Sequence, residues 1–414
     1  MLQQLDNIFF SELDNGIRIA VEEMPWLPSV SLRFVLPSGT IYDVGGMEGS
    51  SVILCDWMER GAGDKDSRSL IDSFNDLGVR RGSGVDKESL AFSASCLAEV
   101  LSPTLALYAD IIRCPILADD EFTSAQQVAL ESLASLDDEP VSRLFIALSE
   151  AFFKSVHGRS GYGSKEGLLA SNPKQLRDDF KRRISPQGLI ISAAGGLKAE
   201  SFVAEIQNLF GDWQGATIPA PEFELAESSY HHLSEDTAQT QIGVAYRGIA
   251  PGQAGWEEDL IAMNALSGGM ASRLFSEVRE KRGLVYSVSA SGRQLKGFGY
   301  NLAYAGTTPE RAQETLSVLL AELSKLYEGI AEQEHERAKT GILSNLIMQG
   351  ESSAARASSL ARSYYLLGEP RSLEVSKVAI SQKSLADVNR FLHAQPKPRF
   401  SVLTLGAKAL EGVA

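Results

Sequence analysis

The sequence is poor in cysteine and in long apolar runs. Its 414 residues contain three cysteines, Cys55, Cys96 and Cys114, with no Cys-x-x-Cys spacing. This odd and scattered set predicts reduced structural thiols. No apolar run approaches the ~20 residues that cross a bilayer, and residues 1–16 lack the basic and apolar regions of a signal peptide. We therefore expect a cytoplasmic protein without a membrane partner.

Positive charge is also scarce. The sequence has 39 lysines and arginines against 53 acidic residues, which gives a formal net charge of −14. Nucleic-acid binding depends on clustered lysine and arginine, and the sequence contains no such cluster. The charge balance argues against a nucleic-acid partner and suits either solubility or a cationic peptide partner.

The length predicts two domains, because 414 residues exceed what one hydrophobic core usually organises. Strand-like runs alternate with amphipathic helical segments. Residues 16–24 and 29–39 are expected to form paired strands, and residues 188–196 a buried strand. Helices are predicted at residues 47–59, 67–77, 101–112, 119–136, 142–154 and 199–210.

The second half of the chain repeats the first. Residues 240–252 match the strand at 30–39, and the helix at 309–323 matches 99–112, both at an offset of about 211 residues. Chance matching of short patterns is the alternative. Together with a Gly-, Pro- and Ala-rich stretch, the repeat predicts a first domain at 1–213, a linker at 214–228 and a second domain at 229–414.

Several segments carry a resemblance to a known family. They are "SGT" at 38–40, "MERG" at 58–61, "SAQQVALESLASLDDEP" at 124–140, "NLFGDW" at 208–213 and "LSGGMASRLFSEVREKRGLVYSVSASG" at 266–292. In this order they resemble the pitrilysin (insulinase) family of zinc peptidases, in particular bacterial proteins similar to mitochondrial processing peptidase. The resemblance implies an α+β fold of two homologous domains, each a largely antiparallel sheet flanked by helices. It also implies that the chain forms half of a clamshell, which a second chain completes around an unfolded peptide.

The zinc motif of that family is degenerate in this sequence. The family motif is H-x-x-E-H, and the resemblance places Val52 and Asp56 at the histidine positions and Cys55 at the position of the glutamate base. The distal ligand position falls at Ser132, next to Glu131. Because imidazole and carboxylate groups supply the zinc shell, we expect no metal in this chain and zinc in a partner subunit.

Substitute ligands are not expected either. Cys55 and Asp56 are adjacent on a helix, so their side chains diverge by about 100° and do not bind one ion from one face together with Glu131. The five histidines lie outside the motif and at no ligand spacing: His157, His231, His232, His335 and His393.

One further pair of residues matches the family. Arg279 and Tyr286 have the spacing of an Arg/Tyr pair that reaches the substrate in this family. Gly283 between them is a natural helix end, which predicts Arg279 in the last helical turn and Tyr286 in the next strand. Two donors at one point can bind a peptide carbonyl and stabilise an oxyanion. The alternative is a surface ion pair of Arg279 with Glu277 or Glu280 and a packed Tyr286.

The resulting hypothesis is a non-catalytic, substrate-binding subunit of a heterodimeric zinc peptidase. A homologous H-x-x-E-H subunit is the expected partner, and an unfolded peptide would add a strand to a sheet edge at residues 80–95. Gly268 and Gly269 are expected to form either a peptide-contacting loop or a helix kink. The alternatives are a catalytically dead scaffold and an independent serine or cysteine hydrolase, but the residues around the Ser pair at 50–51 include no histidine.

Overall fold

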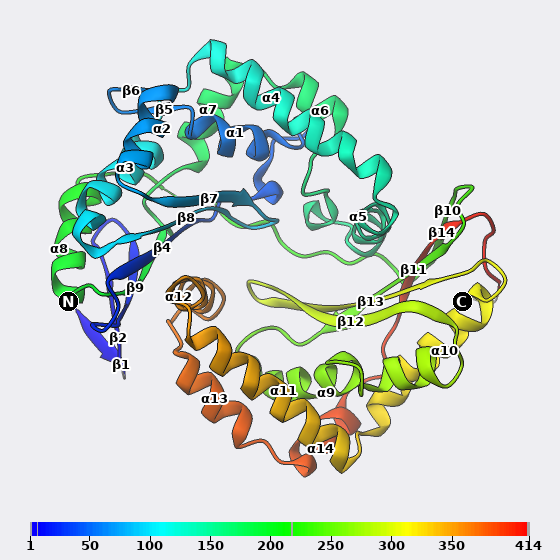
Figure 1. The fold of residues 1–414 in the computed structure, drawn as a ribbon. Helices are drawn as coiled ribbons and strands as arrows, with labels where there is room; N and C mark the ends of the chain where they lie inside the picture. Colours follow the sequence, from blue (N-terminus) through cyan, green and yellow to red (C-terminus); the bar gives the residue numbers. More distant parts are fainter. Residues whose placement is uncertain (1, 6, 217, 412–414) are drawn as a thin grey trace. The chain divides into compact units, whose positions relative to one another are not determined.

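The computed structural model describes residues 2–5, 7–216 and 218–411, which form two compact units (Figure 1). Unit 1 comprises Met1–Ser135, Arg159–Pro221 and Gln349–Leu373. Unit 2 comprises Leu136–Gly158, Glu222–Met348 and Glu374–Ala414. Each unit therefore contains one segment from the other half of the sequence. The described residues of the predicted linker form no helix or strand beyond a single bridge at Leu225.

Unit 1 is built on a seven-stranded mixed sheet of order β1-β2-β3-β9-β4-β8-β7. Its strands are β1 (Gln3–Leu5), β2 (Ile8–Glu12), β3 (Arg18–Glu23), β4 (Ser29–Leu36), β7 (Arg80–Val85), β8 (Leu90–Leu97) and β9 (Ile190–Gly195), with a separate ribbon of β5 (Gly61–Ala62) and β6 (Lys65–Asp66). The expected pairing of β3 with β4 is wrong. Strand β9 lies between them, parallel to β3 and antiparallel to β4. Every residue of β9 is buried, which suits an interior position in the sheet.

Unit 2 repeats this topology in a five-stranded sheet of order β10-β14-β11-β13-β12. Its strands are β10 (Tyr230–Ser234), β11 (Thr240–Gly248), β12 (Val285–Leu295), β13 (Phe298–Thr307) and β14 (Ser401–Gly406). The order matches β3-β9-β4-β8-β7, including the one parallel pair. Strands β4 and β11 begin at residues 29 and 240, an offset of 211, which confirms the predicted duplication.

The helices cover both faces of each sheet. Unit 1 contains α1 (Ser50–Met58), α2 (Ser67–Asp76), α3 (Leu101–Arg113), α4 (Asp119–Ala134), α6 (Lys165–Ala170), α7 (Pro173–Arg183), α8 (Ala199–Phe210) and α12 (Ser353–Leu367). Unit 2 contains α5 (Pro140–Phe152), α9 (Trp256–Ser267), the π-helix η5 (Phe275–Glu280), α10 (Ala312–Lys325) and α14 (Leu385–Ala394), and most of α11 (Glu332–Gly350) and α13 (Leu373–Ser381). Among the described residues, no helix has both the length and the apolar character that spanning a membrane requires.

Two equivalent helices are exchanged between the halves of the sequence. Helix α5 follows the first-half helices, but it packs on β11 and β14, where Leu144 and Leu148 enter an apolar cluster with Leu403. Helix α12 belongs to the second half and packs on β9 and β4 in unit 1 (Figure 1). There Ser192 Oγ donates a hydrogen bond of 2.7 Å to the Ala357 carbonyl. Each sheet thus receives its second cover from the opposite repeat.

Candidate functional site

Helix α1, which carries the degenerate motif, is fixed at its N-terminus by a buried carboxylate. Asp43 accepts hydrogen bonds from the backbone N–H groups of Gly49 and Ser51 at 2.8 and 3.0 Å. Arg183 lies behind it with its side chain fully buried, and pairs with both Asp43 and Asp179. Backbone N–H groups at the start of α1, which have no partner within the helix, therefore donate to the charged carboxylate of Asp43.

The side chains of α1 at the motif positions do not fit a zinc ion. Val52 is aliphatic and packs against the apolar core of unit 1. Cys55 is buried, and burial raises the pKa of its thiol to about 12, so the thiol is neutral in the absence of a metal. Asp56 forms an ion pair of 2.5 Å with Arg60, whose guanidinium also pairs with Glu121 at 3.0 Å.

The distal position offers no ligand either. Helix α4 packs against α1, as a shared metal site would need, and the family resemblance assigns the distal ligand position on α4 to Ser132. The Ser132 hydroxyl donates to the Val128 carbonyl at 2.9 Å, and the neighbouring Glu131 accepts from Gln127 at 3.1 Å. Over the described part of the chain, no group of three or more His, Cys, Asp or Glu side chains has a geometry that could hold a metal.

A polar cluster that the sequence analysis missed joins α1 to the edge of the sheet. Glu59 follows Cys55 by one helical turn and accepts a hydrogen bond from Ser83 Oγ of β7. Its carboxylate lies 3.6 Å from the guanidinium of Arg81, which in turn stacks on the Phe74 ring at 4.5 Å. Burial raises the pKa of Glu59. The i, i+4 spacing of Cys55 and Glu59 was visible in the sequence, but the partner strand was not.

The other predicted residues, Arg279 and Tyr286, line one hollow in unit 2. Arg279 lies in the last turn of η5 and Tyr286 at the start of β12, as expected from the sequence. The hollow has a volume of about 790 Å³ and also includes Arg311 and Glu310. The helical turn before the hollow has π geometry. Such turns are rare in proteins, and those that occur are often found at functional sites.

The chain turns between Arg279 and Tyr286, and hydrogen bonds from neighbouring elements stabilise this turn. Gly283 adopts a φ of +60°, and its N–H donates to the Arg279 carbonyl at 3.0 Å. Arg311 donates to the Gly283 carbonyl, and Thr307 Oγ1 donates to the Leu284 carbonyl at 2.6 Å. Since these groups come from neighbouring elements, the turn is preorganised.

The electrostatics of the hollow differ from the alternative interpretation, a surface ion pair of Arg279 with Glu277 or Glu280. Glu277 pairs with Lys281 at 2.6 Å and with Arg282 at 3.0 Å, and these hydrogen bonds lower its pKa. Among the described residues, no acid forms an ion pair with Arg279, whose guanidinium stacks on the Phe275 ring at 4.9 Å. Tyr286 is 74% exposed, so its ring fills no core position. Both donors are available to a ligand.

The two predicted glycines end a helix. Helix α9 stops at Ser267, and the Gly268 N–H donates to the Asn264 carbonyl at 2.6 Å. A Cβ atom at Gly268 would lie 2.2 Å from Asn264 Oδ1 and 2.5 Å from the Asn264 carbonyl oxygen, so a larger residue would force this helix end to shift. Gly269 follows with a φ of +158°, which makes this segment a turn after the helix.

The histidines have structural partners. His157 is buried and stacks on Phe223 with 4.0 Å between ring centroids. His335 is 2% exposed and contacts the Lys383 carbonyl at 3.2 Å. His231 and His232 hydrogen-bond to hydroxyl groups of Ser229 and Thr404.

Comparison with protein families agrees with this fold. A model of "Insulinase (Peptidase family M16)" matches residues 18–162, and a model of "Peptidase M16 inactive domain" matches residues 171–342. The chain is therefore a homologue of the M16 (insulinase/pitrilysin) family of zinc proteases, and its two repeats are two M16 domains.

Curated relatives extend over nearly the whole chain. The uncharacterized zinc protease YmxG of Bacillus subtilis is 26% identical over 383 residues, which cover 91% of this chain and 92% of the relative. An uncharacterized zinc protease of Rickettsia felis is also 26% identical, with coverage of 88% and 89%.

Solved structures share the fold. The peptidase M16 inactive domain from Pseudomonas fluorescens has a TM-score of 0.88 at 20% identity, with 98% of this chain and 100% of that chain covered. A protease from Helicobacter pylori has a TM-score of 0.87 at 18% identity, with coverage of 97% and 100%.

Proposed function

We propose that this chain is the non-catalytic, substrate-binding subunit of a two-chain zinc metallopeptidase. The observation that carries the proposal is that Arg279 and Tyr286 line one hollow with their donor groups available to a ligand. In the same chain, the side chains of α1 do not fit a zinc ion. The family contributes the expectation of peptidase chemistry, and two curated relatives bear the description of zinc proteases. The zinc and the glutamate base would belong to a homologous H-x-x-E-H chain.

In this proposal the chain acts on the peptide through two hydrogen-bond donors. The Tyr286 hydroxyl and the Arg279 guanidinium would donate to one peptide carbonyl. Both donors strengthen as the oxygen becomes negative, so they would stabilise the transition state more than the substrate. The stacking on Phe275 limits the freedom of the Arg279 guanidinium and lowers the entropy cost of binding.

A sheet edge for the peptide is available in unit 1. Strand β7 (Arg80–Val85) is the last strand of its sheet, and its outer backbone groups can pair with an extended peptide. The edge is shorter than the 80–95 stretch expected from the sequence, because β8 is an interior strand paired on both sides. The Glu59–Ser83 contact would hold this edge in place.

The proposal is tested by reconstitution with an H-x-x-E-H homologue from the same genome. Each chain is purified alone, the two are mixed, and complex formation and cleavage of an unfolded peptide are measured. We expect a stable heterodimer and peptidase activity only in the mixture. Full activity of the partner alone would contradict the proposal. A complex without activity would favour the alternative of a catalytically dead scaffold.

A further inference from the structure

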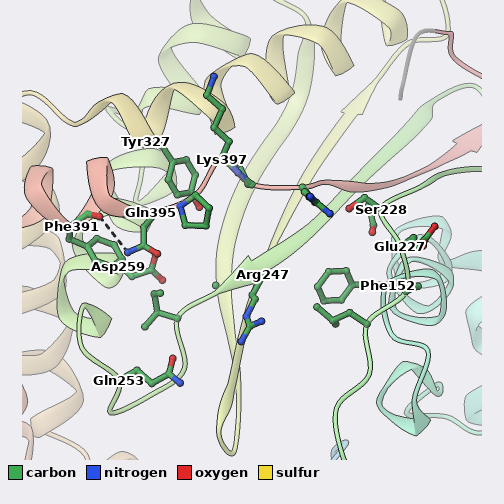
Figure 2. A pocket seen from close by; sticks show the side chains of 18 residues that line it. Phe152, Glu227, Ser228, Arg247, Gln253, Asp259, Tyr327, Phe391, Gln395 and Lys397 are labelled. Atoms are coloured by element: carbon green, nitrogen blue, oxygen red, sulfur yellow. Dashed lines mark hydrogen bonds between the residues drawn. The ribbon is translucent and has the colours of Figure 1, made fainter.

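Unit 2 contains a second groove, which shares no lining residue with the Arg279–Tyr286 hollow. Its volume is about 980 Å³, which is in the range of small-molecule sites. It lies where strand β11 ends and strand β14 begins (Figure 2). The apolar part of its wall is formed by Phe152, Leu225, Tyr327, Phe391, Pro396 and Pro398.

Two arginines from neighbouring segments line this groove. Strands β11 and β14 are antiparallel, and Ala245 stands opposite Ser401. Arg247 is the next to last residue of β11, and Arg399 lies two residues before β14. Both residues are exposed, so their guanidinium groups are accessible to a ligand in the groove.

Among the residues that the structure describes, no acidic side chain forms an ion pair with either arginine. The carboxyl groups of Asp259 and Glu227 line the groove, but within the described residues neither forms an ion pair with Arg247 or Arg399. Arg247 stacks on the Phe298 ring at 5.8 Å, which holds its guanidinium toward the sheet. Figure 2 shows Arg247 between Asp259 and Phe152.

Asp259, which lines the groove, is compatible with a negative ligand. Burial raises the pKa of Asp259 to about 7, since only the backbone N–H of Ile249 stabilises its charged form. Near neutral pH a large part of this carboxyl group is protonated and can donate a hydrogen bond. It therefore adds little negative charge to oppose an anion.

We infer that this groove is a binding site for an organic oxyanion, whose carboxylate or phosphate group is bound by the guanidinium groups that line the groove, Arg247 and Arg399. The guanidinium fork matches both groups with two parallel hydrogen bonds. The apolar wall would contact the body of the ligand. A peptide with a free C-terminal carboxylate and a phosphorylated small molecule present the same chemistry. The inference does not depend on a partner chain or on the role of Arg279.

Calorimetric titration of this chain alone tests the site. The probes are inorganic phosphate, a short peptide with a free C-terminal carboxylate and the same peptide as its amide, all at one ionic strength because screening weakens charge interactions. We expect saturable one-site binding of phosphate or of the free peptide, and about tenfold or more weaker binding in Arg247→Gln and in Arg399→Gln. The amide should not bind at this site.

A matched control is Arg68→Gln, which removes the same charge from an exposed pair with Asp72 in unit 1. This variant should bind like the wild type, and circular dichroism should show that all variants are folded. Preference for phosphate would identify a phosphorylated ligand, and preference for the free peptide would identify a peptide end. Absence of saturable binding for every anionic probe would overturn the inference. Unchanged binding in the Arg247→Gln/Arg399→Gln double variant would also overturn it.

Discussion

Removal of the two donors in the Arg279–Tyr286 hollow separates a catalytic role from a structural one. Tyr286→Phe removes one hydroxyl group and keeps the ring, and Arg279→Ala removes the charge and its donors. If both groups donate to the developing oxyanion, each variant should lose about 2.7–4 kcal/mol of transition-state stabilisation, or about 10²–10³ in turnover.

The structure predicts a much smaller effect of these substitutions on stability. Tyr286 is 74% exposed, so loss of its hydroxyl should change the free energy of unfolding by no more than about 0.5 kcal/mol. Arg279→Ala also removes the stacking on Phe275 at 4.9 Å, which is worth about 0.5–1 kcal/mol at an exposed site. The kinetic loss therefore exceeds the stability loss several-fold.

The assay is peptidase kinetics in the reconstituted heterodimer, with heterodimer formation and the zinc content of the partner measured in parallel. Tyr162→Phe is the matched control, because it removes an exposed hydroxyl from unit 1. Near wild-type turnover in both hollow variants would refute the reasoning. It would show that the pair is structural.

The remaining predictions concern other parts of the chain. Arg183→Met should reduce the free energy of unfolding by about 3–5 kcal/mol in chemical denaturation, since it leaves the buried Asp43 unpaired. Asp259 has a folded pKa of about 7, above its ordinary value of 3.8, so it stabilises the fold below pH 3.8 and this stability is lost as the pH rises to 7. Asp259→Asn should reduce that pH dependence, and an unchanged slope would argue against it. In thiol titration of the native chain, the exposed Cys114 should react rapidly and Cys55 should not, because Cys55 is buried with a pKa of about 12.

Much of the fold could be predicted from sequence because the two repeats keep the same local patterns. Helix α8 spans residues 199–210 as expected, and β4 and β11 have the predicted offset. The exchange of α5 and α12 could not be predicted. Leu144 and Leu148 define an apolar helix face, but periodicity does not specify which sheet that face covers.

The sequence predicted local parts of the site better than distant ones. Arg279 and Tyr286 are separated by one helix end, so Gly283 was enough to place them. The contact of Glu59 with Ser83 joins residues 24 positions apart and depends on how β7 pairs. The predicted pairing of β3 with β4 is wrong because it also depends on a distant segment: the buried strand β9 from far along the chain lies between them.

The most direct test of the central claim is elemental analysis of the purified chain after equilibration with zinc and removal of free metal, together with a peptidase assay of the same sample. The account predicts far less than one zinc per chain and no cleavage, because Val52, Cys55, Asp56 and Ser132 provide no ligand set. One tightly held zinc per chain with peptidase activity that a chelator abolishes would contradict it.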